Sequence, residues 1–120
     1  MHVGVMRIAL EIPGARSLKD KRQVVRSFKE RVKSRLSLSI AEVGHQDKLQ
    51  RATFGVAVVS SDAAICEELL GQVTSMASSL PNALVTDRAT EIMPFGDEGR
   101  GVRGGIGQPS DLPEYEEDDS

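Results

Sequence analysis

The stretch S-L-K-D-K-R-Q-V-V-R-S-F-K-E-R-V-K-S-R-L at residues 17–36 carries two superimposed patterns. Its apolar residues recur at helical spacing, which predicts an amphipathic helix with one buried face. These residues are Leu18, Val25, Phe28, Val32 and Leu36. At about 100° per residue, a set of cations falls within an arc of roughly 80° on another side. These are Lys19, Arg22, Arg26, Lys29 and Lys33. The stretch therefore predicts one helix with a core stripe and a basic stripe.

The first turn of this helix has well-placed caps and badly placed charges. Ser17 is a good N-cap, and Asp20 three residues later forms an approximate capping box. Lys19 and Arg22 lie where the helix dipole is already positive, at a cost of about 0.3–1 kcal/mol each. A bound phosphate would remove that cost, whereas a purely solvated helix face is the alternative interpretation. Lys21 projects into the apolar arc, so we expect it to snorkel or to meet a carboxylate.

The segments on either side of this helix complete a recognisable order of elements. Alternating or continuous apolar residues predict strands at 2–12, 38–44, 52–60 and 84–93, the third central and the fourth at an edge. A second helix is expected from 61 to 80, with an apolar stripe of Ile65, Leu69, Val73, Met76 and Leu80. The order β-α-β-β-α-β predicts an α+β, ferredoxin-like fold, in which two helices cover one face of a four-stranded antiparallel sheet.

Composition divides the chain of 120 residues into a domain and a tail. Residues 1–95 are expected to form one ferredoxin-like domain, and residues 96–120, rich in glycine and then in acids, a disordered tail. Residues 1–96 contain 13 Lys/Arg and 10 Asp/Glu, whereas residues 97–120 contain 2 and 8. The overall charge of −3 therefore does not argue against a polyanionic partner, because the positive charge is concentrated in residues 16–35.

No motif in the sequence indicates catalysis, a metal or a cofactor. Cys66 is the one cysteine and is expected to be buried and inert. His2 and His45 lack partners at metal-ligand spacing, and the G-x-G-x-x-G at 99–104 lacks the strand and helix that a dinucleotide site needs. The first residues resemble neither a signal peptide nor a membrane span, because Arg7 interrupts the apolar run. We expect a cytoplasmic protein that is not an enzyme.

The open face of the predicted sheet does not suit base recognition. Proteins that read single-stranded RNA on such a sheet stack bases on aromatic side chains of the central strands. Here those positions hold Val5, Arg7 and Ala9 on the first strand, and small or aliphatic residues on the third, namely Thr53, Gly55, Ala57 and Val59. Such a face suits a homodimer or another protein at least as well.

Three segments carry a family resemblance. S-L-K-D-K-R-Q-V-V at 17–25, S-I-A-E-V at 39–43 and Q-R-A-T-F-G-V-A-V-V-S at 50–60 resemble the YlxP-like family of small bacterial proteins, a domain of unknown function. The resemblance covers about residues 3–95 and implies a ferredoxin-like fold. It also implies a gene placed among those for transcription elongation, translation initiation and ribosome maturation. It supplies no catalytic site.

Together these features predict a non-enzymatic accessory factor of ribosome assembly or translation. Its partner would be RNA or a ribosomal subunit, bound through the phosphate backbone and without DNA sequence specificity. The predicted contacts are Arg16, Lys19, Arg22, Arg26, Lys29 and Lys33. The alternative is a homodimeric or protein-binding module that uses the open sheet face and does not contact nucleic acid.

Overall fold

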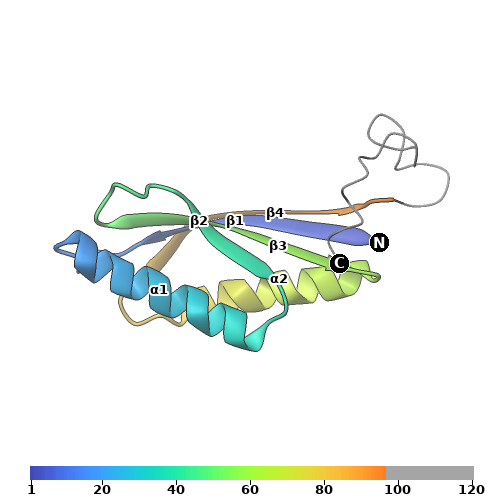
Figure 1. Cartoon of the computed structure of the whole chain (residues 1–120), viewed down its shortest axis with the longest axis horizontal. Coiled ribbons are helices and arrows are strands. Elements are labelled where there is room, and N and C mark those ends of the chain that lie inside the picture. The colour runs from blue at the N-terminus through green and yellow to red at the C-terminus, as the bar shows by residue number, and fades with distance from the viewer. Residues whose placement is uncertain (97–120) are drawn as a thin grey trace, which may run out of the picture.

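The computed structural model describes residues 1–96, and their elements follow the predicted order. The strands are β1 (His2–Glu11), β2 (Ser39–Gly44), β3 (Arg51–Ser60) and β4 (Leu84–Pro94), and the helices are α1 (Leu18–Arg35) and α2 (Ala63–Ser78). All strand pairs are antiparallel, in the sheet order β2-β3-β1-β4. Figure 1 shows this sheet nearly edge-on, above the two helices. The ferredoxin-like prediction is confirmed, including the central position of β3 and the edge position of β4. The predicted disorder of the tail and the motif at 99–104 lie outside the described residues, apart from Gly96.

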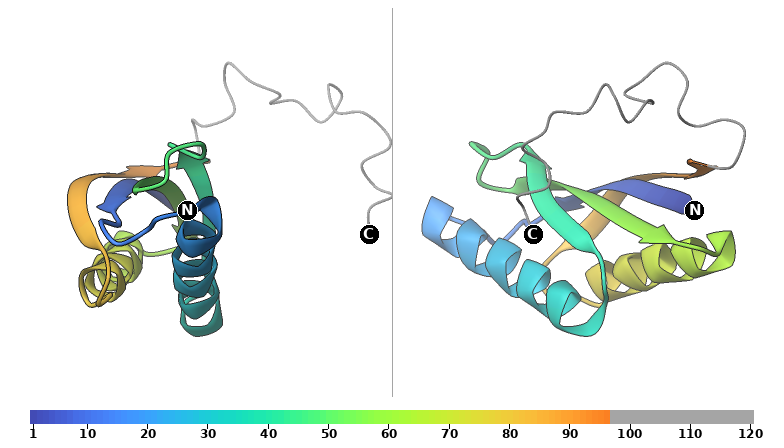
Figure 2. Two further views of the ribbon diagram at one scale, coloured as in Figure 1. Left: turned by 90° about the vertical axis from the view of Figure 1, so that its left-hand side faces the viewer. Right: turned by 45° about the vertical axis from the view of Figure 1, so that its right-hand side comes forward.

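Both helices cover the same face of the sheet, and the opposite face is open (Figure 2). α1 packs beneath β2, and α2 packs beneath β1, β3 and β4. The alternate residues Met6, Ile8 and Leu10 of β1 face the core and are buried, with Ile8 fully inaccessible. On α1, Phe28 meets Phe54 of β3 edge to face, with ring centroids 5.2 Å apart. Burial of this aliphatic and aromatic core is the main driving force for the fold.

The buried face of α2 is rotated from the predicted one. The helix buries Cys66, Leu70, Val73 and Ala77, whereas Ile65 is exposed. Apolar residues surround much of this helix, so its sequence offers two competing stripes. Gly4 of β1 decides between them, since a Cβ at this position would lie 3.1 Å from Leu70 Cδ1 and 3.2 Å from Cys66 Cβ. The missing side chain lets α2 approach β1 closely along the Cys66–Leu70 stripe.

Candidate nucleic-acid interface

The N-terminus of α1 is fixed by two side chains. The backbone N–H of Asp20 donates to the Ser17 hydroxyl at 3.1 Å, which confirms Ser17 as the N-cap. The Asp20 carboxylate accepts from the backbone N–H of Arg16 at 2.9 Å, one residue earlier than in a standard capping box. The first bond satisfies an amide group that the helix itself leaves unpaired. The second fixes the backbone at Arg16, the first of the six predicted contact residues.

The face of α1 toward the sheet buries three apolar side chains and one lysine. Val25, Phe28 and Val32 are buried as predicted, whereas Leu18 is 38% exposed. Lys21, only 2% exposed, lies in line with the apolar residues, where the helical pattern places it. An unpaired ammonium ion buried at this position would destabilise the folded protein. The contacts of the Lys21 side chain therefore determine how α1 is attached to the rest of the fold.

Lys21 connects α1 to β2 and to the loop that follows β2. Its Nζ lies 3.2 Å from Glu42 Oε2, and it donates to the carbonyl oxygens of His45 at 2.5 Å and Lys48 at 2.8 Å. The prediction that this lysine meets a carboxylate is therefore correct. Two donors of the ammonium group are hydrogen-bonded to carbonyl oxygens, and the Glu42 carboxylate balances its charge. Lys21 consequently serves the fold and does not belong to the basic stripe.

The six predicted contact residues lie on α1 or immediately before it. All are exposed except Lys29, which is partly buried. From Lys19 to Lys33, the helical rise gives a length of about 21 Å. Within residues 1–96, no side chain of the six forms an ion pair or a hydrogen bond. We call this set the basic stripe: Arg16, Lys19, Arg22, Arg26, Lys29 and Lys33.

The basic stripe lies on the flank of α1 that faces away from α2. A shallow groove between α1 and the loop after α2 is lined by Gln23, Ser27 and Arg31 from the helix and by Pro81 and Asn82 from the loop. At 100° per residue, the basic stripe projects from the opposite flank. That flank lies at the β2 edge of the molecule, since α1 packs beneath β2 (Figure 2). A partner approaching this edge meets uncompensated cations without displacing α2.

The open face of the sheet carries small and aliphatic residues, as predicted. Val5 of β1 pairs with Ala57 of β3, and Gly55 pairs with Ala41 of β2. Val43 and Val59 are 59% and 63% exposed. The outward positions of the two central strands thus lack the aromatic platform that base stacking requires. This face offers apolar contact area.

Sequence reasoning missed a polar hollow at one end of this open face. It is lined by residues of all four strands, among them Arg7, Arg51, Thr53 and Asp87, and by His45 in the loop after β2. Arg7 donates to Asp87 across the β1–β4 pair at 2.8 Å. This hydrogen bond and the positive charge of Arg7 lower the pKa of the Asp87 carboxyl below its usual 3.8. Only the strand register brings these residues together, so no local motif could have indicated the hollow.

Neither a metal-binding cluster nor a membrane-spanning helix is found in the part of the chain that the structure describes. Within residues 1–96, no group of three or more His, Cys, Asp or Glu side chains is placed to hold a metal ion. No helix in that range is long and apolar enough to cross a membrane. Cys66 is fully buried against β1, as expected for a structural thiol.

Comparison with known proteins shows the family. The sequence model described as "Protein of unknown function (DUF503)" matches residues 3–90. The chain belongs to this family. It is 37% identical over 89 residues to the uncharacterized protein YlxP of Bacillus subtilis (strain 168), a match that covers 74% of this chain and 97% of that protein. The resemblance found in the three sequence segments is therefore confirmed.

One solved structure with a similar arrangement is a dimeric ferredoxin-like protein from an uncultured marine organism. It is 12% identical, with a TM-score of 0.36, and the match covers 78% of this chain and 94% of that one. Because this structural similarity is low, the fold of the DUF503 chain is assigned from its own sheet order and helix placement, described above.

Proposed function

We propose that this DUF503 protein is a non-enzymatic accessory factor of ribosome assembly or translation that binds RNA through the basic stripe. The observation that carries the proposal is the absence, within residues 1–96, of any ion pair to these six side chains. Lys21 of the same helix is hydrogen-bonded to two carbonyl oxygens and ion-paired with Glu42, so the fold compensates a helix cation where that cation is buried. The outward cations contribute nothing comparable to the fold.

The charge distribution favours recognition of the phosphate backbone. Lysine and arginine side chains along one helix flank neutralise phosphates and release counterions, which gives affinity without sequence readout. Two of the six, Lys19 and Arg22, lie near the positive end of the α1 dipole, where a bound phosphate offsets their unfavourable placement. The role in ribosome assembly or translation follows from the gene neighbourhood that the family resemblance implies.

Co-sedimentation with ribosomal subunits tests this proposal. The stripe variant carries Arg22→Gln, Arg26→Gln and Lys29→Gln, which removes three charges and keeps good helix formers in α1. The matched control carries Arg31→Gln, Arg35→Gln and Arg88→Gln, which removes three charges that lie away from the stripe. We expect the stripe variant to lose association with the subunits and the control to retain it. Equal retention by both variants would contradict the proposal.

A second candidate function rests on the exposed aliphatic side chains of the open sheet face. Val5, Val43 and Val59 surround small residues that would allow close approach of a second sheet. In this case the protein is a homodimer or a protein-binding module, and the charges of α1 serve solubility. Sedimentation velocity at tens of micromolar distinguishes the two. A dimer that Val59→Asp converts to a monomer, together with no RNA binding, would favour this second function.

A further inference from the structure

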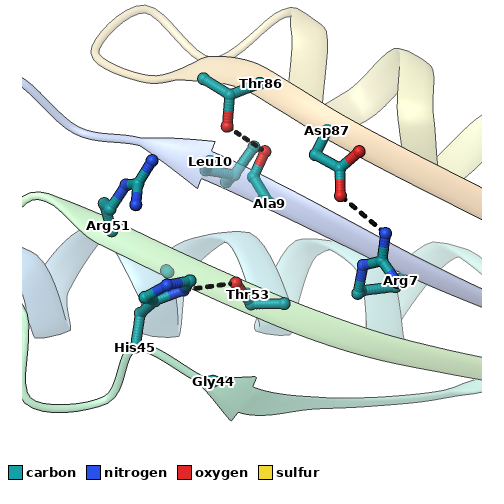
Figure 3. Close-up of a pocket in the computed structure, with 10 residues that line it drawn as sticks. Arg7, Ala9, Leu10, Gly44, His45, Arg51, Thr53, Thr86 and Asp87 are labelled. Atoms are coloured by element: carbon teal, nitrogen blue, oxygen red, sulfur yellow. Dashed lines mark hydrogen bonds and ion pairs between the residues drawn. The ribbon is translucent and has the colours of Figure 1, made fainter.

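The polar hollow on the open face lies on the side of the sheet opposite to both helices. Its volume is about 330 Å³. Figure 3 shows Arg51 and His45 at one end of the hollow, Arg7 and Asp87 at the other, and Thr53 between them on β3. Polar groups that converge from separate strands on one concavity are typical of a small-ligand site. None of the residues of the basic stripe lines the hollow, so the hollow does not depend on the RNA proposal.

The charge in the hollow favours an anion. Asp87 is the one acidic residue in its lining, and it is already paired with Arg7 at 2.8 Å. Arg51 is exposed, and within residues 1–96 its side chain has neither an ion pair nor a hydrogen bond. The guanidinium group of Arg7 also keeps donors that the contact with Asp87 does not use. An anion that enters the hollow therefore meets the free guanidinium group of Arg51 and the guanidinium group of Arg7, which Asp87 holds in position.

His45 is fixed in the wall of the hollow from two directions. Its backbone adopts a left-handed conformation, with φ 60°, just after a register shift between Glu42 and Gly44 in the β2–β3 pair. The backbone carbonyl of His45 accepts from the buried Lys21, and Nδ1 lies 2.8 Å from the hydroxyl oxygen of Thr53. With Nδ1 engaged by Thr53, Nε2 remains as the group for a ligand. The ring is thus held in place before any ligand binds.

We propose that this hollow binds a phosphate monoester group. Arg51 supplies a planar pair of donors suited to two phosphate oxygens, His45 Nε2 donates to a third, and Arg7 adds positive charge from the far side. A monoester is favoured over a phosphodiester because its additional negative charge and third terminal oxygen match donors on several sides of the hollow. The ligand is then a small phosphorylated molecule.

The test is a titration of the full chain followed by amide chemical shifts. The probes are inorganic phosphate, glycerol 1-phosphate and dimethyl phosphate, added at constant ionic strength. We expect saturable shifts at Gly44, His45 and Thr53 with the first two probes. No saturable shift at these amides, or binding of dimethyl phosphate as tight as that of glycerol 1-phosphate, would overturn the proposal.

Three variants separate a built site from general attraction by positive charge. Arg51→Gln and His45→Asn are each expected to weaken phosphate binding about tenfold, the effect of one lost charge-assisted hydrogen bond. Asparagine tolerates the left-handed backbone at position 45, so that variant keeps the loop conformation. Arg88→Gln is the control, because Arg88 pairs with Ile8 and so lies on the other face of the sheet. Equal weakening by Arg51→Gln and Arg88→Gln would overturn the proposal.

Discussion

Replacing Lys21 with methionine removes the buried cation that joins α1 to β2 and to the following loop. The substitution leaves the Glu42 carboxylate and the carbonyls of His45 and Lys48 without their shared donor. Removing one partner of a buried ion pair costs about 3–5 kcal/mol. We expect the lower end, about 3 kcal/mol, because the Glu42 side chain is 17% exposed and the bonds to the two loop carbonyls are only partly buried. Urea denaturation measures this loss in the free energy of unfolding.

A double-mutant cycle shows whether the loss comes from the ion pair. Lys21→Met combined with Glu42→Leu replaces the pair with apolar side chains, so part of the lost stability should return. The coupling free energy between the two positions is expected to be about 1–3 kcal/mol. The control is Lys19→Met, which changes an exposed lysine on the same helix and should stay within about 0.5 kcal/mol. A loss no larger than that of the control, or strictly additive effects, would refute the assigned role of Lys21.

Three further predictions concern packing, acid stability and capping. Gly4→Ala places a methyl group 3.1 Å from Leu70 Cδ1, so we expect a destabilisation of about 1–3 kcal/mol in urea denaturation; a neutral effect would refute the close approach of α2. Arg7→Gln should raise the pKa of Asp87 toward 3.8, measured by NMR of its carboxyl carbon. Since the folded pKa of Asp87 is lowered, its stabilising effect is present above the unfolded pKa and is lost as the pH falls through the folded value; an unchanged pKa in the variant would contradict the pairing. Ser17→Ala should cost about 1 kcal/mol in thermal or urea unfolding, and no loss would argue against Ser17 as the N-cap.

Much of the fold follows from sequence periodicity. The alternation in β1 and the helical spacing in α1 correctly identify buried residues such as Ile8 and Phe28. The buried face of α2 is rotated from the predicted stripe, of which Val73 and Leu80 are buried and Ile65 is exposed, because two apolar stripes were available locally. The choice depends on the space above Gly4, which is a tertiary property. Local pattern therefore predicts an element, and long-range packing sets its rotation when the pattern is ambiguous.

The two candidate sites differ in how far the sequence can predict them. Five of the six residues of the basic stripe lie on one helix, so their spacing is enough to place them on one flank. The hollow combines Arg7, His45, Arg51 and Asp87 from separate parts of the chain. Its assembly needs the register in which Arg7 pairs with Gly55 and Ala89, which no local rule supplies. The domain boundary at residue 95 and the disorder of the tail stay predictions.

The salt dependence of binding to a structured ribosomal RNA fragment tests the central claim most directly. If all six side chains of the basic stripe contact phosphates of a duplex segment, the logarithm of the binding constant should fall with a slope of about −5.4 against the logarithm of salt concentration. The variant with Arg22→Gln, Arg26→Gln and Lys29→Gln keeps three contacts, so its slope should be about −2.7. Between about 50 and 200 mM salt, the affinity should then fall about 2,000-fold for the natural chain and about 40-fold for the variant. Equal slopes, or binding insensitive to salt, would contradict backbone recognition by α1.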